Sequence, residues 1–221
     1  MTYEDRLDAS RLLLERLLAL KILNPLILAI PRGAVPMGAL LAQGLKCEMT
    51  IAPVRKVASP LAPEFALGAV DVEGNYYPDE EVLEFPPEQL RSWFKKSLEV
   101  LRQRNFRWRQ ALPHVVLKGH SVVVVDDGVA TGATMRAALL WARRKEPSQL
   151  IAAVPVSSQS GASIMHRFAD HVLCLDVPHF FSSVGEFYRS FEEVSDDDVC
   201  RILRSFSQSK SQIGNKTQEF R

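Results

Sequence analysis

Residues 122–134 read VVVVDDGVATGAT, and this stretch decides the fold. Its successive valines are typical of a strand that is buried on both faces, because β-branched side chains pack well inside a parallel sheet. The strand would carry Asp126 and Asp127 to its carboxyl end, where the next helix presents unpaired backbone N–H groups. Two anionic acceptors beside an anion-binding loop suit a ligand with vicinal hydroxyls close to a phosphate, as in a ribose 5-phosphate.

Apolar runs of strand length recur along the chain and are mostly separated by helical segments. These runs lie at residues 26–30, 49–54, 122–125, 150–156 and 171–175. Such alternation predicts an α/β fold with a doubly wound, mainly parallel sheet. We expect residues 66–72 to add a short antiparallel strand and residues 89–111 to form one long basic helix.

Composition narrows the class of protein. The 221 residues are 47% hydrophobic and 24% charged, which is enough for one well-buried domain. A formal net charge of +1 is too small to attract nucleic acid or an anionic membrane without a local basic patch. The cysteines are widely spaced and lack CxxC spacing, so they indicate neither a disulfide framework nor a zinc site. Because the first residues also lack the pattern of a secretory signal, we expect a cytoplasmic protein without a membrane segment.

The stretch 122–134 closely resembles the phosphoribosyl pyrophosphate (PRPP) signature of the type I phosphoribosyltransferases, an aliphatic strand followed by paired acids and a T-G-x-T-like loop. The resemblance implies that Asp126 and Asp127 bind the ribose hydroxyls and act in catalysis. Gly128 departs from the family, which usually has an aliphatic residue there. Small residues and hydroxyls let backbone and side-chain donors approach an anion closely. The 5-phosphate would therefore be held by Ala130, Thr131, Gly132, Ala133 and Thr134.

Two further segments resemble the elements of this family that bind pyrophosphate. Residues 31–33, Pro-Arg-Gly, follow the first apolar run, and we expect the glycine to adopt an unusual backbone conformation that aims N–H groups at a diphosphate. A second segment begins with the basic pair at 55–56, at the end of the second run, and residues 59–63 after it resemble the family's mobile loop. A plain turn and a solvated basic pair are the alternative interpretations. The implied diphosphate site comprises Arg32, Gly33, Arg55 and Lys56, of which Arg32 and Lys56 would also act in catalysis.

Residues 177–206 lie where the family keeps its hood, the variable lobe that selects the acceptor. Aromatic side chains there either stack on a planar acceptor or form the core of the hood itself. The candidates for acceptor binding are His179, Phe180 and Phe181. We therefore expect one phosphoribosyltransferase domain over residues 1–206, with its core in 1–176, and a disordered tail over 207–221.

The resemblance implies Mg²⁺-dependent transfer of the 5-phosphoribosyl group from PRPP to a small nitrogen acceptor, a nucleobase of nucleotide salvage, with release of pyrophosphate. Mg²⁺ would be held mainly by PRPP, with no direct protein ligand, or through water by Asp126 or Asp127. Ala130 stands where enzymes of the hypoxanthine type carry an acid, so the acceptor stays open. Members of the family are often dimers, and the leucine-rich segment near the N-terminus is a candidate interface for a homodimer.

The alternative is a PRPP-sensing regulator of nucleotide metabolism that binds the ligand without turnover. Such a regulator could also bind nucleic acid through a basic face of the long helix. A solvated face over a buried aromatic stripe is the simpler interpretation of that helix. Arg32 and Lys56 favour an enzyme, because a sensor has no need of contacts to a leaving group. The basic residues in question are Arg91, Lys95, Arg102 and Arg109.

Overall fold

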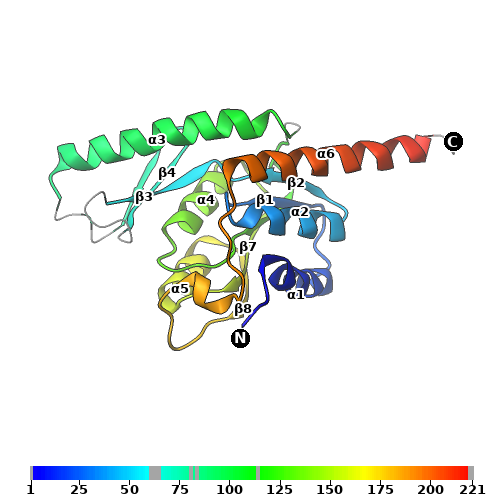
Figure 1. The fold of residues 1–221 in the computed structure, drawn as a ribbon, viewed down its shortest axis with the longest axis horizontal. Coiled ribbons are helices and arrows are strands. Elements are labelled where there is room, and N and C mark those ends of the chain that lie inside the picture. Colours follow the sequence, from blue (N-terminus) through cyan, green and yellow to red (C-terminus); the bar gives the residue numbers. More distant parts are fainter. Residues whose placement is uncertain (1, 60–65, 80–81, 83–84, 113–114, 219–221) are drawn as a thin grey trace.

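The computed structural model describes residues 2–59, 66–79, 82, 85–112 and 115–218. At its centre lies a sheet in the order β2-β1-β6-β7-β8, with parallel pairing throughout (Figure 1). This confirms the predicted α/β fold with a mainly parallel sheet. The strands are β1 (Pro25–Ala29), β2 (Glu48–Ile51), β6 (Ser121–Val125), β7 (Gln149–Val156) and β8 (His171–Asp176).

Both faces of β6 are buried, as its run of valines predicts. Val122 and Val124 point into one hydrophobic cluster and Val123 and Val125 into the other, and all of them are 0% exposed. Side chains alternate across a strand, so a run of apolar residues is stable only where helices cover both faces of the sheet. The paired acids therefore follow a strand that is held rigidly in the middle of the sheet.

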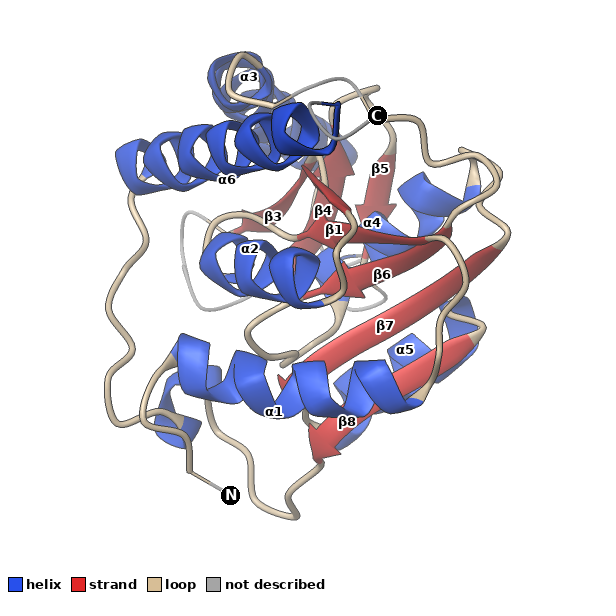
Figure 2. Ribbon diagram, turned by 90° about the vertical axis from the view of Figure 1, so that its right-hand side faces the viewer, coloured by secondary structure: helices blue, strands red, loops and turns tan. Residues whose placement is uncertain are grey.

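Helices supply the two covering layers (Figure 2). Buried hydrophobic residues of α1, α2 and α6 pack on one face of the main sheet, and those of α4 and α5 pack on the other face. No helix in the described ranges is long and apolar enough to cross a membrane. The bounds are α1 (Arg6–Ala19), α2 (Ala34–Gly44), α4 (Ala133–Arg143), α5 (Gln159–Phe168) and α6 (Asp196–Gln218).

A second, antiparallel sheet corrects one expectation. The run at residues 49–54 is not one strand, because β2 ends at Ile51 and the next strand begins at Val54 in the other sheet. Pro53 between them has no N–H to continue the ladder. The second sheet has the order β3-β4-β5 and packs against the long helix α3, while residues 60–63 of the predicted mobile loop lie outside the described residues. These elements are β3 (Val54–Ala58), β4 (Ala66–Asp71), β5 (Tyr76–Pro78) and α3 (Pro87–Arg109).

The C-terminal part differs from the expected hood and tail. Residues 177–206 do not pack as one lobe, because a short 3₁₀ helix (Val184–Phe187) adjoins a small aromatic cluster whereas α6 joins the main core through Val199 and Leu203. The chain is helical to Gln218, where the sequence predicts a disordered tail over 207–221, and residues 219–221 lie outside the described residues. A helix that is already nucleated by packing extends at little cost through polar residues.

Candidate active site

The predicted phosphate loop joins β6 to α4 at the carboxyl end of the sheet. Gly132 caps α4 with a φ of +83°, a left-handed conformation, and a Cβ there would lie 2.9 Å from Ile164. Thr131 Oγ1 accepts a hydrogen bond of 3.4 Å from Ala133 N, and Ala130 and Thr131 are exposed. The loop therefore presents hydroxyl groups and the N–H groups of a helix start, as an anion site requires.

The start of α5 holds this loop in place, a contact that the sequence motifs did not indicate. Val129 forms a parallel bridge with Ser157, and Ser158 N donates to Val129 O at 2.8 Å. Ser158 Oγ donates to Ala130 O. The loop is thus tied to the end of the neighbouring strand β7 through its own backbone carbonyls.

Asp126 and Asp127 follow the end of β6, and distant parts of the chain hold Asp127. Arg6 of α1 pairs through Nε with Asp127 Oδ2 at 2.8 Å, and these side chains are 12% and 14% exposed. The Tyr188 hydroxyl donates to Asp127 O at 2.5 Å, and Asp126 Oδ1 accepts from Asp127 N at 2.9 Å. Arg6 and Tyr188 lie 121 and 61 positions away from Asp127, so no local motif could reveal them.

Gly33 lies against the same carboxylate. A Cβ built on it would be 2.0 Å from Asp127 Oδ2, so the position leaves no room for a side chain. Its φ of −57° and ψ of −36° are ordinary helical values, so the expectation of an unusual backbone conformation is wrong. Close approach to Asp127 is the reason for glycine here. The unusual backbone geometry of this turn lies one residue earlier, where the peptide bond between Pro31 and Arg32 is cis.

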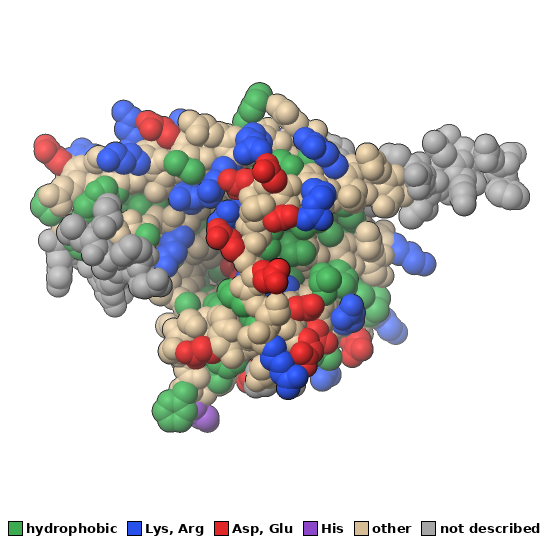
Figure 3. All heavy atoms as spheres, in the orientation of Figure 1, with side chains coloured by type: hydrophobic (Ala, Val, Ile, Leu, Met, Phe, Trp, Pro, Cys, Tyr) green, Lys and Arg blue, Asp and Glu red, His purple; other side chains and the backbone are tan. Residues whose placement is uncertain are grey.

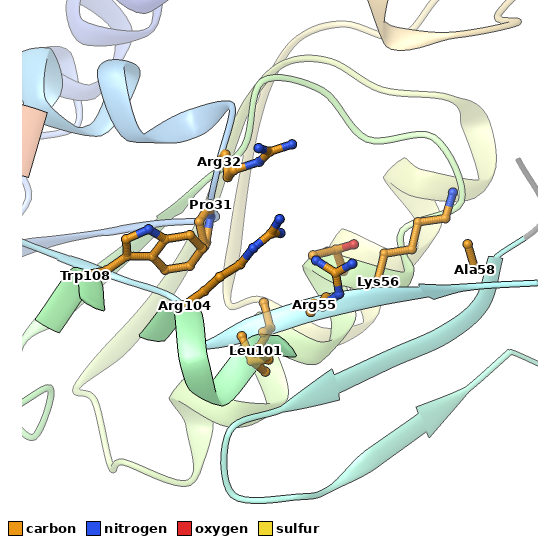
Figure 4. A pocket seen from close by; sticks show the side chains of 10 residues that line it. Pro31, Arg32, Arg55, Lys56, Ala58, Leu101, Arg104 and Trp108 are labelled. Carbon is orange, nitrogen blue, oxygen red and sulfur yellow. The ribbon is translucent and has the colours of Figure 1, made fainter. Parts of the chain in front are cut away.

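A cavity of about 260 Å³ opens beside the phosphate loop and is surrounded by basic side chains (Figure 4). Arg32 and Thr134 line it from the main sheet side, and Arg55 and Lys56 line it from β3. The pKa of Arg55 is lowered, first by burial and then by the positive charges of Arg104 and Arg32. The cavity thus brings together the predicted cations of the diphosphate site and joins them to the phosphate loop through Thr134.

Residues 188–196, hereafter the strap, run along this site toward α6 (Figure 1). Arg6 donates from Nη1 to Glu192 O at 2.7 Å, and Arg32 pairs with Glu193. Figure 3 shows acidic and basic side chains side by side over this face of the molecule. The strap therefore supplies acceptors for two basic side chains that belong to the site.

The candidates for acceptor binding lie after β8, at the edge of the main sheet. His179 is exposed, Phe180 is 93% exposed, and Phe181 stacks on Phe187 with ring centroids 5.3 Å apart. Within the described part of the chain, none of the candidates lines the cationic cavity. The structure therefore does not bring them together with the predicted diphosphate residues.

Gly128 follows the paired acids, and its surroundings explain its departure from the family pattern. A Cβ on Gly128 would lie 2.4 Å from a methyl group of Val184, which belongs to the short 3₁₀ helix. Val184 thus occupies the space that a side chain at position 128 would need. An aliphatic group still covers this place beside Asp127, but it comes from another segment.

Burial and the neighbouring Asp127 carboxylate raise the pKa of Asp126 well above its ordinary value. A raised folded-state pKa contributes stability that is complete below the unfolded value of about 3.9 and is lost as the pH rises through the folded pKa. We expect Asp126→Asn to be more stable than the wild type at pH 7, because asparagine carries no charge to desolvate. The difference should vanish near pH 3.5. Urea unfolding at both pH values checks this, and an equal difference at both would contradict it.

Comparisons with known proteins identify the family of this chain. The sequence profile described as "Phosphoribosyl transferase domain" matches residues 5–188. The Mycobacterium tuberculosis proteins "Putative phosphoribosyl transferase MT0597" and "Putative phosphoribosyl transferase Rv0571c" are each 34% identical over 204 residues, 91% of this chain and 46% of theirs. The chain thus spans about half the length of these relatives. The crystal structure of TT1426 from Thermus thermophilus is 39% identical, has a TM-score of 0.78, and covers 93% of this chain and 99% of its own. The chain therefore belongs to the phosphoribosyl transferase domain family.

Proposed function

We propose that this protein transfers the 5-phosphoribosyl group of PRPP to a small nitrogen acceptor and releases pyrophosphate. The observation that carries the proposal is the contiguity of the site. Thr134 belongs to the phosphate loop and also lines the cavity of Arg32, Arg55 and Lys56, while Gly33 packs on Asp127. PRPP carries a 5-phosphate, two ribose hydroxyls and a 1-diphosphate, and adjoining parts of the site offer groups for each of them.

The carbon–oxygen bond at C1 of the ribose breaks in this reaction, and its electron pair leaves with the diphosphate. The nitrogen of the acceptor forms the new bond to C1 with its lone pair and releases its proton to solvent. Asp126 and Asp127 accept hydrogen bonds from the ribose hydroxyls and hold C1 in position. Arg32, Arg55 and Lys56 stabilise the negative charge that collects on the diphosphate as it departs. The 5-phosphate is bound by Ala130, Thr131, Gly132, Ala133 and Thr134.

Mg²⁺ fits this site as an ion carried by PRPP. Among the described residues, no group of three or more His, Cys, Asp or Glu side chains is arranged to hold a metal ion. Asp127 is paired with Arg6, so Asp126 is the better candidate to contact the ion, through water. When bound, Mg²⁺ neutralises phosphate charge, which aids departure of the diphosphate.

We further propose a nucleobase as the acceptor. The exposed ring of Phe180 is available to stack on a planar base, with His179 beside it as a hydrogen-bonding group. Phe181 would then support the site from behind through its stack on Phe187. This segment would have to approach the ribose when the acceptor binds.

A panel assay tests the proposed function. The protein is incubated with PRPP, Mg²⁺ and individual purine and pyrimidine bases, and pyrophosphate release is measured. We expect release with at least one base, and none from a matched double variant, Asp126→Asn with Asp127→Asn. If no base leads to pyrophosphate release, the proposal of a nucleobase acceptor is wrong.

One observation favours the alternative of a PRPP sensor. Arg32 is paired with Glu193 of the strap, and Arg6, which pairs with Asp127, also donates to Glu192 O of the strap. A ligand that binds Arg32 and Asp127 therefore changes contacts made by the strap. Such a rearrangement could report occupancy to a partner. Calorimetric PRPP binding together with no pyrophosphate release for any acceptor would support the sensor and exclude the transferase.

A further inference from the structure

Arg104 is a basic residue of the cationic cavity that the sequence motifs did not indicate. It comes from α3, whereas the other basic residues of the cavity come from β3 and from the turn after β1. Its Nε lies 3.0 Å from Asp196 Oδ2, and the side chains are 27% and 23% exposed. Figure 4 shows the head of Arg104 inside the cavity near that of Arg32. The ion pair with α6 therefore fixes Arg104 while its terminal nitrogens remain directed at the cavity.

The cavity contains a half-buried positive charge, that of Arg55, in addition to the paired charges of Arg32 and Arg104. Arg55 Nε is buried, and within the described ranges it has no hydrogen-bond partner. The charges of Arg104 and Arg32 both act against the charge of Arg55, which agrees with their facing one space. An anion with several charged oxygens would relieve this repulsion and satisfy the buried donor.

The wall behind Arg104 strengthens its attraction for an anion. Leu101 and Trp108 line the same cavity from α3 and are 1% and 2% exposed. Apolar side chains exclude water and lower the local dielectric constant, so a charge pair formed here is screened less than one at the open surface. Leu101 and Trp108 thus strengthen the attraction between Arg104 and an anion in the cavity.

We propose that Arg104 is a further diphosphate-binding residue, added to the site by α3 and positioned by Asp196. This inference rests on the proposed function, because it takes the diphosphate of PRPP as the group that enters the cavity. A guanidinium offers paired N–H donors in the geometry of phosphate oxygens. The antiparallel sheet and α3 would then serve binding directly as well as covering the site.

Arg107 provides a matched control on the same helix. It pairs with Asp197 of α6 at 2.8 Å, but these side chains are 55% and 88% exposed and Arg107 does not line the cavity. Replacing either arginine removes one ion pair between α3 and α6. Replacement of Arg104 alone also removes a cavity cation.

The test compares Arg104→Gln, Arg104→Lys and Arg107→Gln by calorimetric titration with inorganic pyrophosphate and with ribose 5-phosphate. We expect Arg104→Gln to weaken pyrophosphate binding about tenfold or more, because it removes one charge-assisted hydrogen bond. Binding of ribose 5-phosphate should be unchanged. Arg104→Lys keeps the charge and should give an intermediate loss. Arg107→Gln should change neither affinity.

Other outcomes separate this inference from the proposed function. Wild-type protein that binds pyrophosphate, with an Arg104→Gln variant no weaker than Arg107→Gln, overturns the role of Arg104 alone. An equal loss for both ligands also overturns it, because a general structural defect has no preference for pyrophosphate. If Arg104→Gln fails to fold, Arg104→Lys decides by the same comparison. Wild-type protein that binds neither PRPP nor pyrophosphate overturns both proposals.

Discussion

An Asp127→Asn variant is expected to bind PRPP and ribose 5-phosphate about 10- to 100-fold more weakly than the wild type, while its affinity for pyrophosphate changes little. A hydrogen bond to a charged acceptor contributes about 1.5–3 kcal/mol, and each 1.4 kcal/mol is a factor of ten in affinity. Asparagine keeps the shape of the side chain but removes this charge from the proposed ribose site. Titration calorimetry with each ligand separately measures the effect.

The variant should also lose stability, because Arg6 is only 12% exposed and would keep its charge without a carboxylate partner. A second substitution, Arg6→Gln, should recover part of the stability but not the affinity for ribose 5-phosphate. Asp170→Asn is the control. Asp170 forms an ion pair of 2.8 Å with Arg143, and this pair lies outside the candidate site. Unchanged ribose 5-phosphate binding by Asp127→Asn would refute the role given to this acid.

We expect Gly33→Ala to displace the Asp127 carboxylate by steric crowding, without changing any charge in the site. The added Cβ would lie 2.0 Å from Oδ2 and 2.8 Å from Cγ of Asp127, and 3.3 Å from Arg6 Nε. The carboxylate must move, so PRPP affinity should fall at least about tenfold, and overpacking should cost about 1–3 kcal/mol of stability. Urea unfolding and PRPP titration on the same sample give both quantities.

Gly38→Ala, inside helix α2 that Gly33 caps, is the matched control for this prediction. Its Cβ would crowd Ala29 Cβ at 2.8 Å and Met49 Cε at 3.0 Å, inside the core and away from the acids. We expect it to lose stability without losing PRPP affinity in the folded protein. Equal PRPP affinities for the two variants would show that the contact between Gly33 and Asp127 has no part in the site.

The local part of the fold and site could be predicted from the sequence. The stretch 122–134 specifies a buried strand, its acids and a helix start within thirteen positions, and all of these depend on neighbours in the chain. The sequence also places the glycine of residues 31–33 in the candidate site, but for a backbone conformation that the structure does not have. Nothing in the pattern distinguished close approach from a positive φ, since glycine permits both.

Contacts between distant segments could not be predicted in this way. Arg6, Tyr188 and Asp196 reach the site only because the fold brings α1, the strap and α6 to the carboxyl end of the sheet. The basic pair lies in β3 of the antiparallel sheet and not at the end of a parallel strand. The strand break at Pro53 causes this difference, and the sequence pattern does not show that a second sheet follows the break. Hydrophobic periodicity indicates which face of a helix or strand is buried, but it does not indicate which helices and strands pack together.

The ion pair between Arg32 and Glu193 makes ligand binding an exchange reaction. An entering anion replaces a carboxylate that the protein itself supplies, so its observed affinity is its intrinsic affinity multiplied by the fraction of molecules in which the pair is open. Glu193 is 79% exposed, and an exposed pair of this kind is worth about 1 kcal/mol or less, so this threshold is about fivefold at most. A singly charged anion only repeats what Glu193 already provides, whereas a diphosphate brings further charge for the neighbouring cations. We therefore expect the pair with Glu193 to lower the affinity of every anion by the same small factor, which a diphosphate recovers through the other cations of the cavity and a singly charged anion does not.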